Sequence, residues 1–200
     1  MNVTRRAVLG AATAVGISVA GCLGGEESTE PPETPIAGDP DADVTVTVYE
    51  DFSCGGCVTF KRNQFPQIEA QYIDPGEIRY EYRDFPIPVD DTWSGAVAHA
   101  GREVYETAGD DAFFSFSAAI YDHHPTYSYD LIEETADDLD LDGAAIRDAA
   151  EDRTHEDAVD ANRSYGESNG VEGTPSVFVD GDPVEDPFNG WQPAIDNALE

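Results

Sequence analysis

The sequence predicts an α/β fold, in which helices flank a central β-sheet and a helical subdomain is inserted between two parts of that sheet. Two features indicate this fold. Residues 44–49 and 78–83 alternate in side-chain character as strands do, and a helical segment lies between them. Residues 91–170 then carry apolar side chains at helical spacing, before one more strand and a closing helix.

The first strand leads directly into the expected helix, which runs from Cys54 to Tyr72. Pro66 falls inside this segment and should kink or split the helix, because proline lacks the backbone N–H that a helix interior needs. The second strand ends at a loop that contains Pro86 and Pro88. A βαβ unit is the simplest arrangement of these three elements.

The inserted segment should contain four helices. Residues 93–104 and 113–120 each place apolar or aromatic side chains on one helical face, and residues 131–139 and 145–149 repeat the pattern more briefly. A polar run, residues 162–170, follows the fourth helix. We expect the aromatic side chains of this segment to fill the core rather than to bind a cofactor.

The end of the chain predicts a hairpin and a helix. Residues 176–179 form a strand, and Asp180-Gly181 is a strong signal for a tight turn. The partner strand is expected near Val184 and Phe188, and residues 191–199 close the chain as a helix.

The chain is strongly acidic, with 42 acidic residues against 10 basic ones and a formal net charge of −32. Such charge repels itself in dilute buffer, whereas molar salt shortens the screening length to roughly 3 Å and removes most of the repulsion. The composition therefore indicates an extreme halophile, and we expect an archaeon. It argues against nucleic acid as a ligand, because no basic patch exists to neutralise phosphates.

Residues 1–21 have the pattern of an export signal. Arg5-Arg6 precede an apolar stretch, residues 7–20, and no acidic residue occurs there. This stretch is shorter than the roughly 20 residues that span a membrane, so a permanent transmembrane anchor is the weaker interpretation. Residues 4–9 resemble the twin-arginine signal, which implies export of an already folded protein.

Cys22 follows small residues at the end of that stretch, and residues 18–22 resemble a lipobox. The resemblance implies that Cys22 becomes the lipidated first residue of the mature protein and anchors it to the membrane; a stable anchor needs dual acylation. The alternative is an incidental cysteine. Residues 22–40 are rich in Gly, Pro and Glu and are expected to form a flexible acidic tether, so that the folded domain spans residues 41–200.

The pair Cys54 and Cys57 carries the chemistry. A cysteine at the start of a helix lies against unpaired backbone N–H groups, which stabilise a thiolate and make Cys54 the expected nucleophile. Cys57 lies one turn further on, where it can attack a mixed disulfide on Cys54 and release the substrate. Gly55-Gly56 offers no side chain to the thiolate, so any lowering of its pKa must come from the helix and its surroundings.

Two other interpretations of the pair are weaker. A structural disulfide between cysteines three residues apart closes a very short loop and adds little stability. Structural zinc needs four ligands, and no second cysteine pair exists to supply them. The only histidines that could complete a metal site are His99, His123, His124 and His155. We expect the adjacent pair His123 and His124 to be solvated or to cap a helix.

Three runs, residues 49–57, 83–86 and 171–181, together resemble the DsbA-like branch of the thioredoxin superfamily. The resemblance in element order extends over residues 41–200. It implies a thioredoxin-like fold, with a central mixed sheet flanked by helices. It also implies a cis bond between Thr174 and Pro175, with Pro175 beside Cys54 and Thr174 pairing with the substrate backbone.

The chain departs from this family in two places. Many relatives carry a buried acid six residues before the first cysteine, where this chain has Val48, so proton transfer to Cys57 falls to Glu50, Asp51 or water. The dipeptide between the cysteines also differs from the Pro-His of the strongly oxidising members. The direction of electron flow therefore stays open at this point.

We expect a thiol–disulfide oxidoreductase that exchanges the Cys54–Cys57 disulfide with exported proteins at the extracytoplasmic face of the membrane, where disulfides persist. It would act as a dithiol oxidase, with a membrane redox partner and without metal or organic cofactor. A disulfide reductase or isomerase is the alternative from the same class. Two other classes are a copper-binding thioredoxin-like lipoprotein, using both cysteines and a histidine, and a solute-binding lipoprotein with an inert pair.

Overall fold

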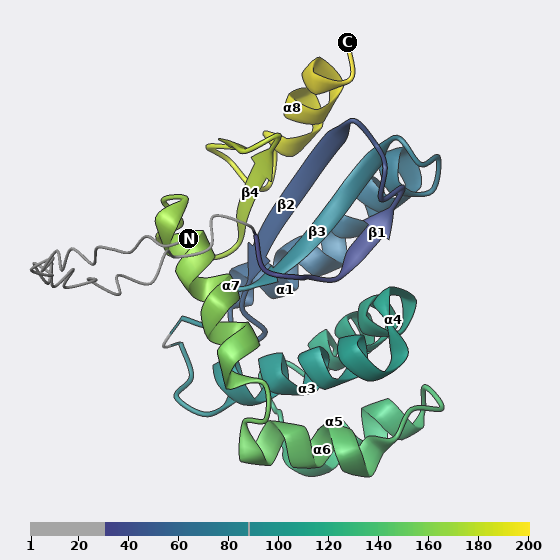
Figure 1. Cartoon of the computed structure of the whole chain (residues 1–200), viewed down its shortest axis with the longest axis vertical. Helices are drawn as coiled ribbons and strands as arrows, with labels where there is room; N and C mark the ends of the chain where they lie inside the picture. The colour runs from purple at the N-terminus through teal and green to yellow at the C-terminus, as the bar shows by residue number, and fades with distance from the viewer. Residues whose placement is uncertain (1–30, 88) are drawn as a thin grey trace, which may run out of the picture. The chain divides into compact units, whose positions relative to one another are not determined.

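A computed structural model describes residues 31–87 and 89–200 of the chain (Figure 1). The predicted signal peptide and Cys22 lie outside the described residues. Within the described part, none of the helices combines the length and the hydropathy needed to cross a membrane.

The core of the protein is a mixed sheet of five strands in the order β1-β3-β2-β4-β5. Their bounds are β1 Ile36–Gly38, β2 Val44–Glu50, β3 Ile78–Asp84, β4 Ser176–Val179 and β5 Asp182–Pro183. β2 and β3 run parallel, as the predicted βαβ unit requires, and the other three pairings are antiparallel. The predicted α/β class with a central mixed sheet is confirmed.

β1 corrects the predicted boundary of the domain. Residues 22–40 were predicted to form a flexible tether, but Ile36–Gly38 pairs antiparallel with β3. The segment is too short and too poor in apolar residues to signal a strand, and its order comes from bonds to the rest of the fold. Pro35 O accepts from Tyr82 N at 3.0 Å, and Ile36 N donates to Asp110 Oδ1 at 2.7 Å.

The segment after β2 is divided as Pro66 predicted. α1 (Gly55–Asn63) is followed by α2 (Phe65–Ile68), which contains Pro66 in its first turn, and by a π-helical turn, η1 (Glu69–Ile73). Proline is tolerated there because the first N–H groups of a helix have no partner within it. The buried apolar side chains of α1 and α2 belong to the main hydrophobic core, together with most of those of β2 and β3.

Five helices, rather than the four expected, lie between β3 and β4: α3 (Trp93–Ala108), α4 (Asp110–Tyr121), α5 (Tyr129–Asp137), α6 (Gly143–Asp152) and α7 (Glu156–Ser168). Figure 1 shows α3 to α6 gathered at one end of the sheet, with α7 leading back toward β4. The polar run of residues 162–170 largely belongs to α7, whose buried face is made by Val159, Asn162 and Gly166. A Cβ at Gly166 would lie 2.8 Å from the Phe85 ring, so glycine permits this close approach.

The predicted hairpin is present, but its second strand begins earlier than expected. Asp180 and Gly181 adopt φ values of 51° and 85°, as a two-residue turn with both residues in the left-handed region requires. β5 therefore begins at Asp182 rather than near Val184. α8 (Trp191–Ala198) closes the chain, and buries Trp191 and Ile195 in the core.

Candidate active site

The two cysteines occupy different depths at the start of α1. Cys54 is the residue immediately before the helix, has extended backbone angles and is partly exposed. Cys57 lies one turn into the helix and is fully buried. Because β2 ends at Glu50, a loop of three residues delivers Cys54 to the helix start. The positions of both cysteines are therefore set by the end of β2 and the start of α1, which only a short loop separates.

Asp51 braces that loop from within. Its buried carboxylate accepts a hydrogen bond from Ser53 N at 2.7 Å and another from Ile87 N at 2.8 Å. The side chain therefore ties the loop before Cys54 to the loop that follows β3. Burial raises the pKa of Asp51, and the bonds from Ser53 and Ile87 oppose the rise.

The helical insertion holds the same loop from outside. Tyr127 donates its hydroxyl to Phe52 O at 2.7 Å, and Nε2 of His124 lies 3.1 Å from Ser53 O. His124 was expected to be solvated or to cap a helix, and this expectation is wrong. The ring contacts the backbone next to Cys54, because the loop between α4 and α5 folds back over the start of α1.

The environment of Cys54 stabilises its thiolate. Its pKa is lowered from 9.0 to about 5, chiefly by a hydrogen bond from the Cys57 thiol and further by the backbone N–H groups of Cys57 and Gly56. These are the donors that a helix start leaves unpaired. The glycine pair offers no side chain, and the effect was expected to come from the helix and its surroundings.

Cys57 shows the opposite behaviour. Burial raises its pKa well above the ordinary value, and the hydrogen bond to Cys54 and the nearby carboxyl of Glu50 raise it further. Asp51 N donates to Cys57 Sγ at 3.5 Å. The two thiols therefore differ sharply in acidity although they lie three residues apart.

The loop before β4 brings the other two predicted site residues to the pair. The bond between Thr174 and Pro175 is cis, and the Cys54 thiol donates to Thr174 O at 3.3 Å. A Cβ at Gly56 would lie 3.0 Å from Pro175 Cδ, whereas one at Gly55 would meet nothing within 4 Å. A side chain at position 56 would therefore crowd the proline ring, whereas one at position 55 would not.

A buried carboxyl group lies beside Cys57. Glu50 is 1% exposed, and burial raises its pKa from 4.5 to about 7. Tyr121 donates its hydroxyl to Glu50 Oε2 at 2.9 Å, and attraction to the Lys61 ammonium opposes the rise. Val48, at the position where many relatives carry an acid, is fully buried in the core.

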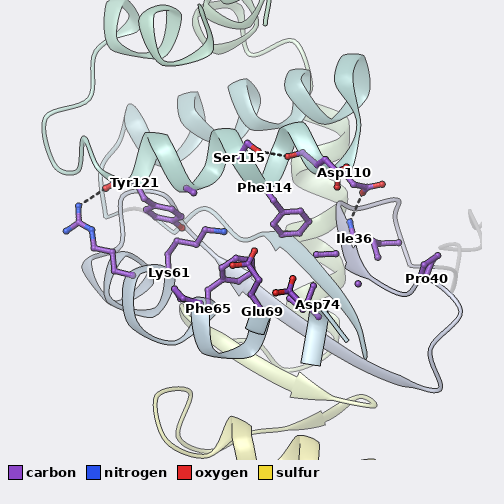
Figure 2. Close-up of a pocket in the computed structure, with 17 residues that line it drawn as sticks. Ile36, Pro40, Lys61, Phe65, Glu69, Asp74, Asp110, Phe114, Ser115 and Tyr121 are labelled. Atoms are coloured by element: carbon purple, nitrogen blue, oxygen red, sulfur yellow. Dashed lines mark hydrogen bonds between the residues drawn. The ribbon is translucent and has the colours of Figure 1, made fainter. Parts of the chain in front are cut away.

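Lys61 lies between this carboxyl group and a cleft of about 830 Å³ (Figure 2). Burial lowers its pKa from 10.5 to about 8, and its Nζ lies 3.7 Å from the centroid of the Phe65 ring. Figure 2 shows Lys61, Phe65, Phe114 and Tyr121 along the cleft. Lys61 is the single lysine of the sequence, and no role was predicted for it. Its spacing of four residues from Cys57, on the same helical face, is the signal that could have found it.

Asp84 is a second buried acid that sequence reasoning missed. It lies opposite Glu50 in the parallel pairing of β2 and β3, and burial raises its pKa from 3.8 to about 7. The residue belongs to one of the runs that carry the family resemblance, so its position in a motif was visible while its burial was not.

The histidines considered as metal ligands do not form a metal site. His99 Nδ1 accepts from His155 N at 3.2 Å, and His155 Nε2 lies 2.6 Å from Glu103 Oε2. In residues 31–87 and 89–200, no group of three or more His, Cys, Asp or Glu side chains has the arrangement of a metal site.

Comparison with known proteins places the chain in a family. A family model described as thioredoxin matches residues 30–197. The chain belongs to the thioredoxin family. The predicted thioredoxin-like fold is confirmed, and relatives named disulfide bond formation proteins support a DsbA-like protein-disulfide oxidoreductase.

Among the relatives, a probable disulfide bond formation protein D of Bacillus cereus is 26% identical over 172 residues, which cover 82% of this chain and 77% of the relative. Disulfide bond formation protein D of Bacillus subtilis is 22% identical over 72% of this chain and 67% of its own. The fold is similar to that of oxidised BdbD from Bacillus subtilis, with a TM-score of 0.77 and 20% identity over 84% of this chain and 96% of the other. The fold is also similar to that of Chlamydia trachomatis DsbA, with a TM-score of 0.71 and 21% identity over 82% of this chain and 90% of the other.

Proposed function

We propose that this DsbA-like protein is a dithiol oxidase that introduces disulfides into exported proteins through Cys54 and Cys57. The observation that carries the proposal is the contrast between the two thiols. Cys54 is partly exposed with a pKa of about 5, whereas Cys57 is buried with a raised pKa. The relatives named disulfide bond formation proteins support the same assignment.

The proposed reaction is two exchanges of sulfur partners. A substrate thiolate attacks Cys54 Sγ of the oxidised pair, and the Cys57 sulfur leaves and takes up a proton. A second substrate thiolate then attacks the substrate sulfur of the mixed disulfide, and Cys54 leaves as a stable thiolate. Two electrons pass to the enzyme and a disulfide forms in the substrate. A membrane redox partner must accept these electrons to restore the Cys54–Cys57 disulfide.

Glu50 is the best candidate for the proton that Cys57 takes up. Its pKa of about 7 is close to neutral pH, and its charge acts on Cys57. Asp51, the other acid considered from the sequence, uses one carboxylate oxygen to hold Ser53 and the other to hold Ile87. Thr174 and Pro175 are proposed to receive the substrate backbone beside Cys54.

Linkage between ionisation and stability supports the proposed oxidising direction. In the reduced folded protein Cys54 has a pKa of about 5, against 9.0 for an ordinary thiol. A lowered pKa contributes stability above the unfolded value, and this contribution is lost as pH falls through about 5. The disulfide form has no thiolate and gains nothing. A stabilised reduced form makes the pair a stronger oxidant.

The test compares the unfolding free energies of the reduced and oxidised proteins between pH 4 and pH 8. We expect the reduced form to gain on the oxidised form by about 1–3 kcal/mol across this range, after allowance for the exposure of Cys54. Molar salt should be present, since we propose a halophilic source whose acidic surface needs screening. A disulfide form that is clearly more stable at pH 8 would favour a reductase or a structural bond.

We also propose that the protein works at the extracytoplasmic face of the membrane, exported by the twin-arginine signal and anchored through lipid on Cys22. The support is sequence alone: paired arginines, a short apolar stretch and small residues before the cysteine. Such an anchor would keep the active site near the proposed membrane redox partner.

The change Cys22→Ser tests the anchor. Without an acceptor thiol the mature protein should lose its lipid and move from the membrane fraction to the medium, or persist as uncleaved precursor. Mass spectrometry and fractionation measure both effects. Unchanged mass and partitioning would show that Cys22 is not lipidated.

A further inference from the structure

The cleft of about 830 Å³ shown in Figure 2 is bounded by α1, α2, η1, α4 and β1. Its lining includes neither Cys54 nor Cys57, and neither Thr174 nor Pro175. The proposed disulfide exchange therefore takes place outside this cleft. Its side chains form three zones, which are a cation at the base, apolar walls and an acidic rim.

A buried ammonium group forms the base of the cleft. Lys61 is 5% exposed, and Figure 2 shows its side chain pointing into the cleft. Its Nζ lies 3.7 Å from the centroid of the Phe65 ring and 5.4 Å from that of the Phe114 ring. Glu50 and Glu69 act on its charge, but within the described part of the chain no carboxylate pairs with Nζ and no oxygen accepts from it. A buried ammonium with three free donors is stabilised by an anion that accepts from them.

The walls of the cleft are apolar. The rings of Phe65 and Phe114 stack with their centroids 5.9 Å apart and their planes 8° from parallel. Aliphatic carbon from Ile36, Pro66 and Ile73 extends this surface. Ligand sites of proteins typically combine such a lining with a few polar groups in a volume of roughly 300–1,000 Å³. The walls therefore suit an apolar side chain.

The rim of the cleft is acidic. Glu69, Asp74 and Asp111 are exposed, and their carboxylates have no hydrogen-bond or ion-pair partner among the described residues. Asp110 differs, because its Oδ1 accepts from Ile36 N at 2.7 Å. Unpaired carboxylates at the rim attract a cation and repel a purely anionic ligand. A ligand whose anion reaches Lys61 must therefore carry a positive charge at its other end.

We propose that this cleft binds the C-terminal end of a short peptide, with its carboxylate on Lys61, an apolar last side chain against the walls and its ammonium group at the acidic rim. The three parts of such a peptide match the three zones of the cleft in the same order. A peptide, unlike a single amino acid, separates its two charges by the length of its chain. The ligand needs no cysteine, so the inference does not depend on the proposed function.

The experiment is calorimetry of the full protein in molar potassium chloride with the tripeptide Ala-Ala-Phe, its C-terminal amide and its N-acetyl form. We expect Ala-Ala-Phe to bind saturably at one site. The amide should bind at least about tenfold more weakly, because a hydrogen bond to a buried charge is worth roughly that factor or more. Acetylation should weaken binding only about twofold to fivefold, because it removes a charge at the exposed rim. The loss on acetylation should shrink as salt is raised, whereas the loss on amidation should persist.

Three variants locate the site. Lys61→Met removes the ammonium group at similar side-chain length and should abolish the difference between the acid and the amide. Arg62→Met is the matched control: Arg62 lines the same cleft, but its guanidinium donates to Tyr121 O at 3.2 Å and pairs with Asp122 at 3.3 Å, so the difference should remain. Ala118→Phe fills the cleft from an exposed position of α4 and should abolish binding of all three peptides. Circular dichroism checks that each variant is folded.

Absence of saturable binding, or equal affinity for Ala-Ala-Phe and its amide, would overturn the proposal. This comparison uses the unchanged protein, so it decides the question even if Lys61→Met does not fold. A difference between acid and amide that survives in folded Lys61→Met, or binding that is unaltered in Ala118→Phe, would place the peptide elsewhere and overturn the proposal as well.

Discussion

The two ends of the first turn of α1 place their thiols in opposite environments. At Cys54 the helix begins, the thiol is partly exposed, and backbone N–H groups surround it. At Cys57 the thiol is fully buried, next to a carboxyl group and among aromatic side chains. One region favours a thiolate and the other a thiol.

This contrast shows how a chain with glycine at both positions between its cysteines can still separate their roles. The Cys57 thiol and the backbone N–H groups of the helix start act on Cys54, while the end of β2 brings Glu50 to Cys57. Because these groups belong to the sheet and the helix, the asymmetry depends on both elements.

The largest effect is expected when each thiol is removed in turn. Cys57→Ser should accumulate mixed disulfides with exported proteins through Cys54, because the resolving thiol is gone while the exposed nucleophile remains. Cys54→Ser should trap almost none, since Cys57 is buried. Non-reducing gels and mass spectrometry of trapped species measure the difference, which should exceed about tenfold. Equal trapping by both variants would contradict the assigned roles.

A second test concerns the proton at Cys57. Below pH 7 a neutral Glu50 can supply the proton that the leaving Cys57 sulfur needs, and above pH 7 its carboxylate instead repels that sulfur. The oxidation rate, normalised to the substrate thiolate, should therefore fall as pH rises through about 7. Glu50→Gln should lower the rate on the order of tenfold at pH 6 and flatten this profile.

Asp84→Asn is the matched control for that experiment. Asp84 is also buried, lies opposite Glu50 in the sheet, and has a pKa raised to about 7. Glu50, not Asp84, is the carboxyl whose charge raises the pKa of Cys57. If the change in rate near pH 7 disappears in Asp84→Asn but persists in Glu50→Gln, then Asp84 rather than Glu50 supplies the proton, and the assignment to Glu50 is wrong. In Glu50→Gln the buried Lys61 loses the nearby carboxylate charge. Circular dichroism checks that this variant is still folded.

The sequence was most informative where local pattern decides structure. Alternation predicted β2 and β3, Pro66 predicted the division of the first helix, and the spacing of Cys54 and Cys57 predicted the helix-start thiolate. β1 escaped prediction because tertiary hydrogen bonds, rather than its own composition, order it. His124, Tyr121 and Lys61 escaped for a related reason: their contacts join segments far apart in the chain, and a single sequence does not show which side chains become buried together.

The smallest expected effect separates the two glycines. A Cβ at Gly55 meets nothing within 4 Å, so Gly55→Ala should stabilise the protein by a few tenths to about 1 kcal/mol through the lower backbone entropy of the unfolded chain. A Cβ at Gly56 would lie 3.0 Å from Pro175 Cδ and 3.5 Å from Cys54 Sγ, so Gly56→Ala must displace the proline ring and should forfeit that gain. Only Gly56→Ala should also slow exchange with glutathione, by about twofold to fivefold, because 1 kcal/mol corresponds to roughly that factor. Thermal unfolding and stopped-flow exchange measure the two effects. Indistinguishable variants would mean that the contact between Gly56 and Pro175 has no influence on the reactivity of Cys54.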